Sequence, residues 1–261
     1  MVNGASLALA GANVVMQLSR RPVGRAVAES TVYGGSLVHH PLKRTRTTLS
    51  YVMLALFGTD DERCELRRQV NAQHRPVRSE PGAAVPYRAT DPELQLWVAA
   101  CMYYGVRDAL ALLYGRPTDD RADEVYHQCA RFATTLQVPD AAWPRDRAAF
   151  EVYWRDGLTR LAVDDVTRTY LLNLIDLRFL PTPLARAAGP AHRFLTTGFL
   201  PPAFRDLLGL EWDDARQRRF ERVVHTGAAL ATRLPRPVRE FPWNWCLHDA
   251  RRRLRRGRSL V

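Results

Sequence analysis

Signals that begin and end helices recur along this chain, and they constrain its fold more than any other feature. Gly58 follows an apolar stretch that begins near Leu42, and glycine commonly closes helices in the left-handed conformation. Thr59 and Glu62 then form a T-x-x-E capping box, in which each side chain accepts a hydrogen bond from a backbone N–H. The pattern predicts helices over residues 42–57 and 60–74, because Pro76 disfavours helical geometry at the residue before it.

Similar signals predict a long helix in the middle of the chain. Thr90 and Glu93 repeat the capping-box spacing, and the apolar run from Leu94 to Tyr114 continues to Gly115. Helical periodicity also predicts helices over residues 8–18, 23–30, 119–134, 145–160, 164–179 and 212–233, with prolines between several of them. No convincing strand alternation accompanies these signals. We therefore predict an all-α fold, a single multi-helix domain over residues 1–250.

The basic residues are nearly all arginine, and many lie at the end of the chain. The net charge is +11, and Lys43 is the one lysine. Residues 251–258 read RRRLRRGR, and we expect residues 251–261 to form a solvated basic tail. Such a charge run can attract nucleic acid or an anionic membrane surface. No helix-turn-helix, zinc-finger or aromatic RNA-binding signature accompanies it, so we expect no specific nucleic-acid partner and only weak membrane-surface contact.

The sequence also favours a cytoplasmic protein that is at most peripheral to a membrane. The uncharged stretch over residues 1–19 contains several polar residues and lacks a basic region, so it fits neither a signal peptide nor a membrane-spanning helix. The cysteines are widely spaced without a C-x-x-C pair, and we expect them to be buried free thiols in a reducing compartment; they are Cys64, Cys101, Cys129 and Cys246.

His74 is the first candidate for chemistry. Leu66, Val70 and His74 are spaced four residues apart, so the histidine shares a helix face with aliphatic residues. A histidine so placed is more often a hydrogen-bonded core residue than a metal ligand, yet imidazole is a common ligand of haem iron. Arg44 and Thr48 share a face of the preceding helix, where the guanidinium could pair with a propionate or polarise dioxygen. An exposed basic turn is the alternative.

A rival metal site lies at Glu124 and His127, whose E-x-x-H spacing is the unit used in di-iron helical bundles. Such a site needs a second copy, and no other glutamate has a histidine three residues later. We expect surface or capping roles for the remaining histidines, His39, His40, His192, His225 and His248. The sequence has no G-x-S-x-G elbow, phosphate-binding glycine loop or H-E-x-x-H helix, so hydrolase, kinase and zinc-protease functions lose their usual support.

Several segments, in order and with matching spacing, resemble the core signature of the rubber-oxygenase (latex clearing protein) and MpaB family. The signature is an arginine with a threonine four residues later, a Gly-x-x-x-Glu helix start, and V-x-x-x-H-x-x-V. It matches HPLKRTRTT at 40–48, FGTDDE at 57–62 and VNAQHRPV at 70–77. YRATDP at 87–92 with WVA at 97–99, and WP at 143–144 with FEVYW at 150–154, resemble later blocks. The resemblance spans roughly residues 12–180.

The resemblance implies an all-helical fold with a globin-like haem-binding core, haem b as cofactor, and oxidative cleavage of alkene-containing isoprenoid chains with dioxygen. It implies that His74 is the iron ligand, with Arg44 and Thr48 near the haem. Glu29 falls one residue from a carboxylate proposed as a base in the rubber-cleaving branch. That branch has a lysine where this chain has Thr47.

A second departure is Ser79, which replaces a glycine common in the family. We therefore expect a substrate that is apolar but smaller than polyisoprene, and a redox partner of unknown identity. The predicted function is a haem b-dependent oxygenase. Two alternatives stay open on the sequence: a haem-binding sensor or carrier without turnover, which needs the same pocket, and an arginine-tailed interaction protein without a cofactor.

Overall fold

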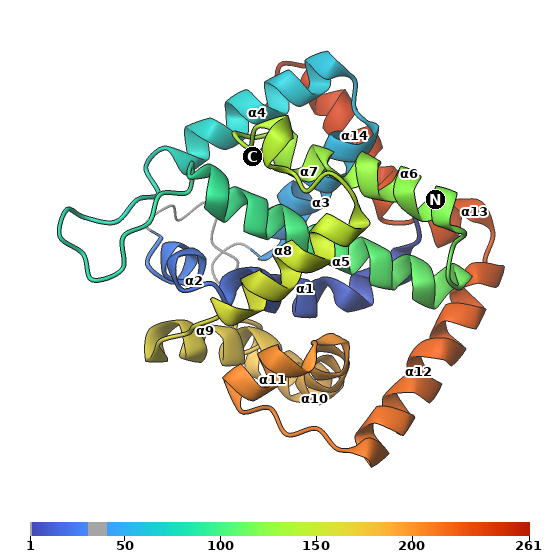
Figure 1. The fold of residues 1–261 in the computed structure, drawn as a ribbon. Coiled ribbons are helices and arrows are strands. Elements are labelled where there is room, and N and C mark those ends of the chain that lie inside the picture. The colour runs from blue at the N-terminus through green and yellow to red at the C-terminus, as the bar shows by residue number, and fades with distance from the viewer. Residues whose placement is uncertain (1, 31–40) are drawn as a thin grey trace.

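The computed structural model describes residues 2–30 and 41–261, and within them the chain is built from helices (Figure 1). The one β-type pairing in the described part is an isolated antiparallel bridge between Arg78 and Arg88. The prediction of a single all-α domain is confirmed. The first half contains η1 (Gly4–Leu9), α1 (Ala10–Leu18), α2 (Arg21–Ala28), α3 (Pro41–Phe57), α4 (Asp60–His74), α5 (Pro92–Tyr114), α6 (Asp119–Cys129) and α7 (Arg131–Thr134).

The second half of the chain continues with further helices. These are η3 (Asp140–Ala142), α8 (Arg147–Thr159), α9 (Asp165–Ile175), α10 (Thr182–Phe199), α11 (Pro202–Leu208), α12 (Asp214–Arg233), α13 (Arg236–Arg239) and α14 (Trp243–Arg255). Of these, η3, α10, α11, α13 and α14 are missing from the sequence-based prediction. Pro183 and Pro202 account for the omission of α10 and α11, because both lie in a first helical turn, where a missing N–H costs no hydrogen bond.

The two predicted capping boxes have different outcomes. At α4 the box forms as expected: the Thr59 N–H donates to Glu62 Oε2 at 2.9 Å, and the Glu62 N–H donates to Thr59 Oγ1 at 3.2 Å. At α5 the prediction is wrong, because Asp91 is the cap. Its carboxylate accepts from the N–H groups of Glu93 and Leu94, and Pro92 becomes the first helical residue. Asp91, directly before the helix, therefore caps α5 in place of the predicted Thr90.

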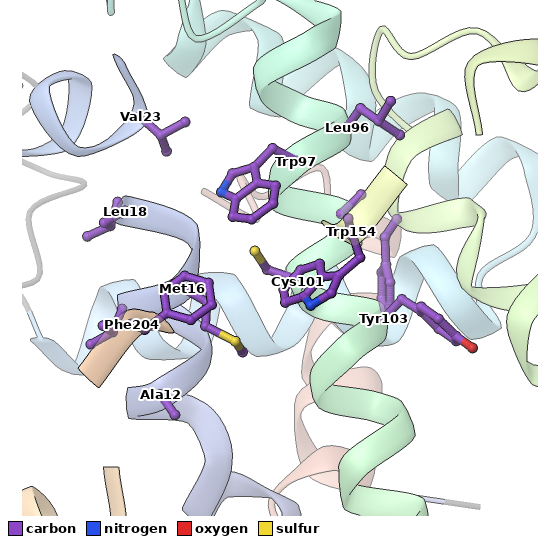
Figure 2. Packing of buried hydrophobic residues seen from close by; sticks show 14 of the residues in the cluster. Ala12, Met16, Leu18, Val23, Leu96, Trp97, Cys101, Tyr103, Trp154 and Phe204 are labelled. Carbon is purple, nitrogen blue, oxygen red and sulfur yellow. The ribbon is translucent and has the colours of Figure 1, made fainter. Parts of the chain in front are cut away.

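The main core is organised around Trp97 in α5, which is fully buried (Figure 2). Its ring stacks on Trp154 of α8 with centroids 5.2 Å apart, and its Nε1 donates to the Gln17 carbonyl of α1 at 3.2 Å. Gly157 permits this approach of α8, since a Cβ there would lie 2.5 Å from Trp97. Among the cysteines, Cys101, Cys129 and Cys246 are buried as predicted, whereas Cys64 is exposed.

By length and composition α5 could also cross a membrane, and no other helix in the described ranges meets that test. Half of its most apolar window is buried inside the protein. Its apolar character is accounted for by its place at the centre of the core, where it contacts α1, α7 and α12.

The end of the chain packs against α3 and α4, so the prediction of a solvated tail is wrong. Figure 1 shows α14, in red, beside the blue α3 and cyan α4. Leu260 is 2% exposed and joins a second apolar cluster with Leu54, Leu66 and Ala250. Its N–H donates to Gln69 Oε1 at 2.6 Å. The arginines that begin at Arg251 belong to an amphipathic helix, α14, whose apolar residues contact this cluster.

Candidate functional site

The candidate site lies at the open end of the hairpin formed by α3 and α4. Gly58 and Thr59 join the two helices, so the chain reverses direction between them. Arg44 lies in the first turn of α3, and His74 is the last residue of α4. Each is separated from the turn by roughly 20 Å of helix, so the reversal returns His74 to the level of Arg44. Local helix signals in the sequence thereby position the two side chains.

His74 has the properties of an unprotonated, unpartnered imidazole. Its Nδ1 is buried without a hydrogen-bond partner, while Nε2 has no partner either but is reachable by solvent. Burial, and then the positive charge of Arg44, lower the pKa of His74 to about 4. The ring is therefore neutral at physiological pH, and a neutral imidazole keeps a lone pair available for a metal.

Arg44 faces His74 and Tyr170, which lies on α9. Neighbouring protein partly desolvates the guanidinium and lowers its pKa, while the phenol of Tyr170 acts in the opposite direction. Arg44 is nevertheless an exposed residue. No described carboxylate pairs with it. Burial also raises the pKa of Tyr170, so the phenol keeps its proton. Sequence reasoning missed Tyr170, since it belongs to no motif and lies far along the chain from α3.

Thr48 and Glu29, the two other predicted site residues, make no described side-chain contact with His74 or Arg44. Thr48 is exposed one turn after Arg44, and its hydroxyl makes no hydrogen bond to a described residue. Glu29 caps the C-terminus of α2, accepts from Arg25 Nη1 at 2.5 Å, and accepts from the Tyr87 hydroxyl at 3.2 Å. No described contact links Glu29 to His74, and the catalytic role of Glu29 stays a prediction.

The Thr47 hydroxyl, which stands where the rubber-cleaving branch has a lysine, donates to the Lys43 carbonyl at 2.9 Å. The Thr47 hydroxyl is thus hydrogen-bonded within α3. Glu124 and His127 are exposed on α6, and Glu124 pairs with Arg121. Residues 2–30 and 41–261 contain no cluster of three or more His, Cys, Asp or Glu side chains suited to a metal ion. Haem needs only one such ligand from the chain, so His74 remains a candidate.

The other histidines have ordinary surroundings where the structure describes them. His192 is half-buried, and its Nδ1 is 2.8 Å from the carbonyl of Ile175, the last residue of α9, which agrees with the predicted capping role. His225 and His248 are exposed. His39 and His40 lie outside the described residues. His74 is therefore distinguished by a buried ring nitrogen without a partner.

Comparison with known proteins agrees with the resemblance of the α3–α4 segments. The family model "ER-bound oxygenase mpaB/B'/Rubber oxygenase, catalytic domain" matches residues 1–229. The chain belongs to this family. An uncharacterized protein of Mycobacterium tuberculosis is 46% identical over 254 residues, which cover 97% of this chain and 99% of the relative. An uncharacterized protein of Mycobacterium bovis matches with the same values. No solved structure matches significantly.

The mpaB/rubber oxygenase match contains the whole candidate site. Arg44, His74 and Tyr170 all fall within residues 1–229, whereas α14 follows the matched region. The family's name relates the chain to oxygenases. The names of the two mycobacterial relatives give no activity.

Proposed function

We propose that this mpaB/rubber oxygenase family member is a haem b-dependent oxygenase, acting with dioxygen on a small apolar substrate of the isoprenoid or other alkene class. The observation that carries the proposal is the state of His74. It is a neutral imidazole with a buried, unpartnered nitrogen, and it lies beside a desolvated arginine within the family's matched region. We further propose that the helices around it form the globin-like core that the family resemblance implies.

The residues at this end of the hairpin suit haem. His74 would hold the haem iron, because its ring is neutral and one nitrogen has solvent access. Arg44 has no carboxylate partner among the described residues, and a propionate would be a suitable negative group for its guanidinium. Thr48 offers a hydroxyl on the same helix face as Arg44. Bound haem b supplies the redox chemistry that activates dioxygen.

The chain's own groups then bind, orient and exclude water. Arg44 donates hydrogen bonds to a propionate or to a polarised oxygen atom, and the protonated Tyr170 hydroxyl is a second donor near it. Along α3 the face that carries Arg44 and Thr48 continues to the half-buried Val52, which packs against the main core. An apolar wall on that side favours an apolar substrate over a charged one.

Two measurements on the purified full-length chain test the proposal. The visible spectrum should show the Soret band of haem b, and oxygen consumption should rise when squalene is added as an alkene probe. A colourless preparation that also fails to take up added hemin contradicts the haem assignment. A Soret band without oxygen uptake across apolar alkenes contradicts the oxygenase and leaves a haem sensor or carrier.

A further inference from the structure

Arg78 and Arg88 face each other in the segment between α4 and α5. The Ser79 N–H donates to the Tyr87 carbonyl at 3.0 Å, and the Ala89 N–H donates to the Val77 carbonyl at 2.9 Å. These hydrogen bonds flank the bridge between Arg78 and Arg88 instead of joining the two residues. Such a non-hydrogen-bonded antiparallel pair has Cα atoms about 4.5 Å apart and side chains on one face. The backbone thus places the two arginine side chains next to each other at their Cα atoms.

This arrangement carries a cost that no described residue offsets. Like charges directly opposite each other destabilise an antiparallel pair. Neither Arg78 nor Arg88 forms an ion pair with a carboxylate in the described part of the chain. Glu80 lines an adjoining hollow together with both arginines, but it pairs with neither. Both arginines are exposed, so solvent reduces this repulsion, and an anion that bridges the two guanidinium groups would remove it.

A third arginine lies beside the pair and completes a cavity. Arg75, Val77, Arg78, Arg88 and Thr90 line a hollow of about 280 Å³, and none of these lining residues is acidic. Arg75 directly follows His74 at the end of α4, where a cation is favourable because of the helix dipole. That explanation does not extend to Arg78 and Arg88. The cavity presents guanidinium donors and a hydroxyl, which is the donor set that binds carboxylate and phosphate oxygens.

We propose that this cavity is a binding site for an anionic group of the carboxylate or phosphate class. The backbone pairing places the two arginines opposite each other on one face, so both guanidinium groups can reach the same anion. The anion has two candidate sources, a propionate of bound haem or the acidic head group of a separate amphipathic ligand. The inference rests on the bridge and the cavity, and it holds whether or not the protein binds haem.

Thermal unfolding of the full chain in phosphate and in chloride, at equal ionic strength, tests the anion site itself. Phosphate should raise Tm more than chloride, because it binds the folded protein. Arg88→Gln should abolish that difference, and in chloride it should not lower Tm, since it removes a like-charge repulsion. Arg67→Gln is the matched control, because Arg67 is an exposed, unpaired arginine on α4 and its loss changes the net charge equally. Equal Tm shifts in both salts together with unchanged haem content in Arg88→Gln, or a phosphate effect retained in Arg88→Gln and Arg78→Gln, overturn the proposal.

Calorimetric titration and haem content then separate the two sources. If dodecanoate or phosphate binds the purified protein, and Arg88→Gln weakens binding about tenfold or more while haem content stays unchanged, the anion is a separate head group. If no free anion binds the wild type and the variant loses haem, the anion is a propionate. A variant that retains both anion binding and haem refutes the site. A colourless protein whose phosphate binding depends on Arg88 refutes the proposed haem function and leaves this inference standing.

Discussion

His74 has a buried ring nitrogen, and Arg44 is an exposed guanidinium beside it. The histidine has an unpaired ring nitrogen, and the arginine has no carboxylate within the described residues. The charge of Arg44 adds to burial in lowering the pKa of His74, so the imidazole stays neutral beside the guanidinium. A buried polar atom without a partner costs about 1–3 kcal/mol, so the unpaired His74 nitrogen beside a guanidinium indicates a ligand site better than a structural one.

Replacing His74 by alanine should remove most of the bound haem or change its ligand-field spectrum. No other described side chain at this end of α4 offers an imidazole that could take its place. Absorption spectra of His74→Ala, compared with His127→Ala and His225→Ala as exposed controls, give the measurement. An unchanged His74→Ala spectrum, together with a colourless variant at another histidine, contradicts the assignment of the iron ligand.

Replacing Arg44 by alanine should have an intermediate effect. The iron ligand stays, so the Soret band should persist, but loss of charge-assisted hydrogen bonds worth about 1.5–3 kcal/mol should speed haem release roughly tenfold or more. Haem transfer to apomyoglobin measures the rate, and Lys43→Ala is the control, because Lys43 is an exposed neighbour. Release at the wild-type rate shows that Arg44 does not contact the cofactor.

Sequence patterns could predict the part of the site that lies on one hairpin. Arg44 and His74 follow from helix spacing and from the family signature, because both lie a fixed number of residues from the Gly58 turn. Tyr170 could not be predicted, since its approach to Arg44 depends on the packing of α9. The opposition of Arg78 and Arg88 likewise depends on a pairing register that no sequence pattern marks.

At the scale of helices, Glu62 joins the start of α4 to α14. Its side chain completes the capping box with Thr59 and accepts from Arg251 Nε at 3.0 Å. Burial acts to raise the pKa of Glu62, but the hydrogen bond from Arg251 and that from the Thr59 backbone outweigh it, so the pKa is lowered overall. One carboxylate therefore connects a predicted helix start to a helix that the sequence analysis missed.

The lowered pKa of Glu62 predicts how stability depends on pH. The folded-state pKa lies below the ordinary value of 4.5, so ionised Glu62 stabilises the fold above that pH, and the contribution is lost as pH falls through the folded-state pKa. Glu62→Gln should be less stable than wild type near neutral pH and should lose less stability on acidification. Glutamine preserves the capping box, which isolates the charge. Urea unfolding between about pH 3 and 7 measures this.

Glu221→Gln is the control for that series, because Glu221 is exposed on α12 and makes no ion pair. It should reproduce the wild-type pH profile. A Glu62→Gln profile parallel to that of the wild type shows that the pair with Arg251 contributes nothing to the fold.

At the scale of the whole molecule, the last residues close the fold over the hairpin that carries the site. Capping and periodicity predicted most helices before α10, because those signals are local. The C-terminal part was harder, since prolines inside first turns resembled separators and arginines concealed the apolar side of α14. The family match ends at residue 229, yet the mycobacterial relatives align with 97% of the chain, so the aligned length includes most of this closing segment.

Leu260 tests whether the chain end is part of the fold. It packs in one cluster with Leu66 and Val70, the aliphatic residues on the α4 face that continues to His74. Leu260→Ala should therefore lower the unfolding free energy by about 2–3 kcal/mol, as truncation of a buried leucine does. Leu184→Ala, at a position 57% exposed, should change it by less than about 0.5 kcal/mol. Because Leu260 supports the helix that presents His74, its loss should also speed haem release. Equal stabilities of the two variants in urea unfolding would show that the end of the chain is solvated after all.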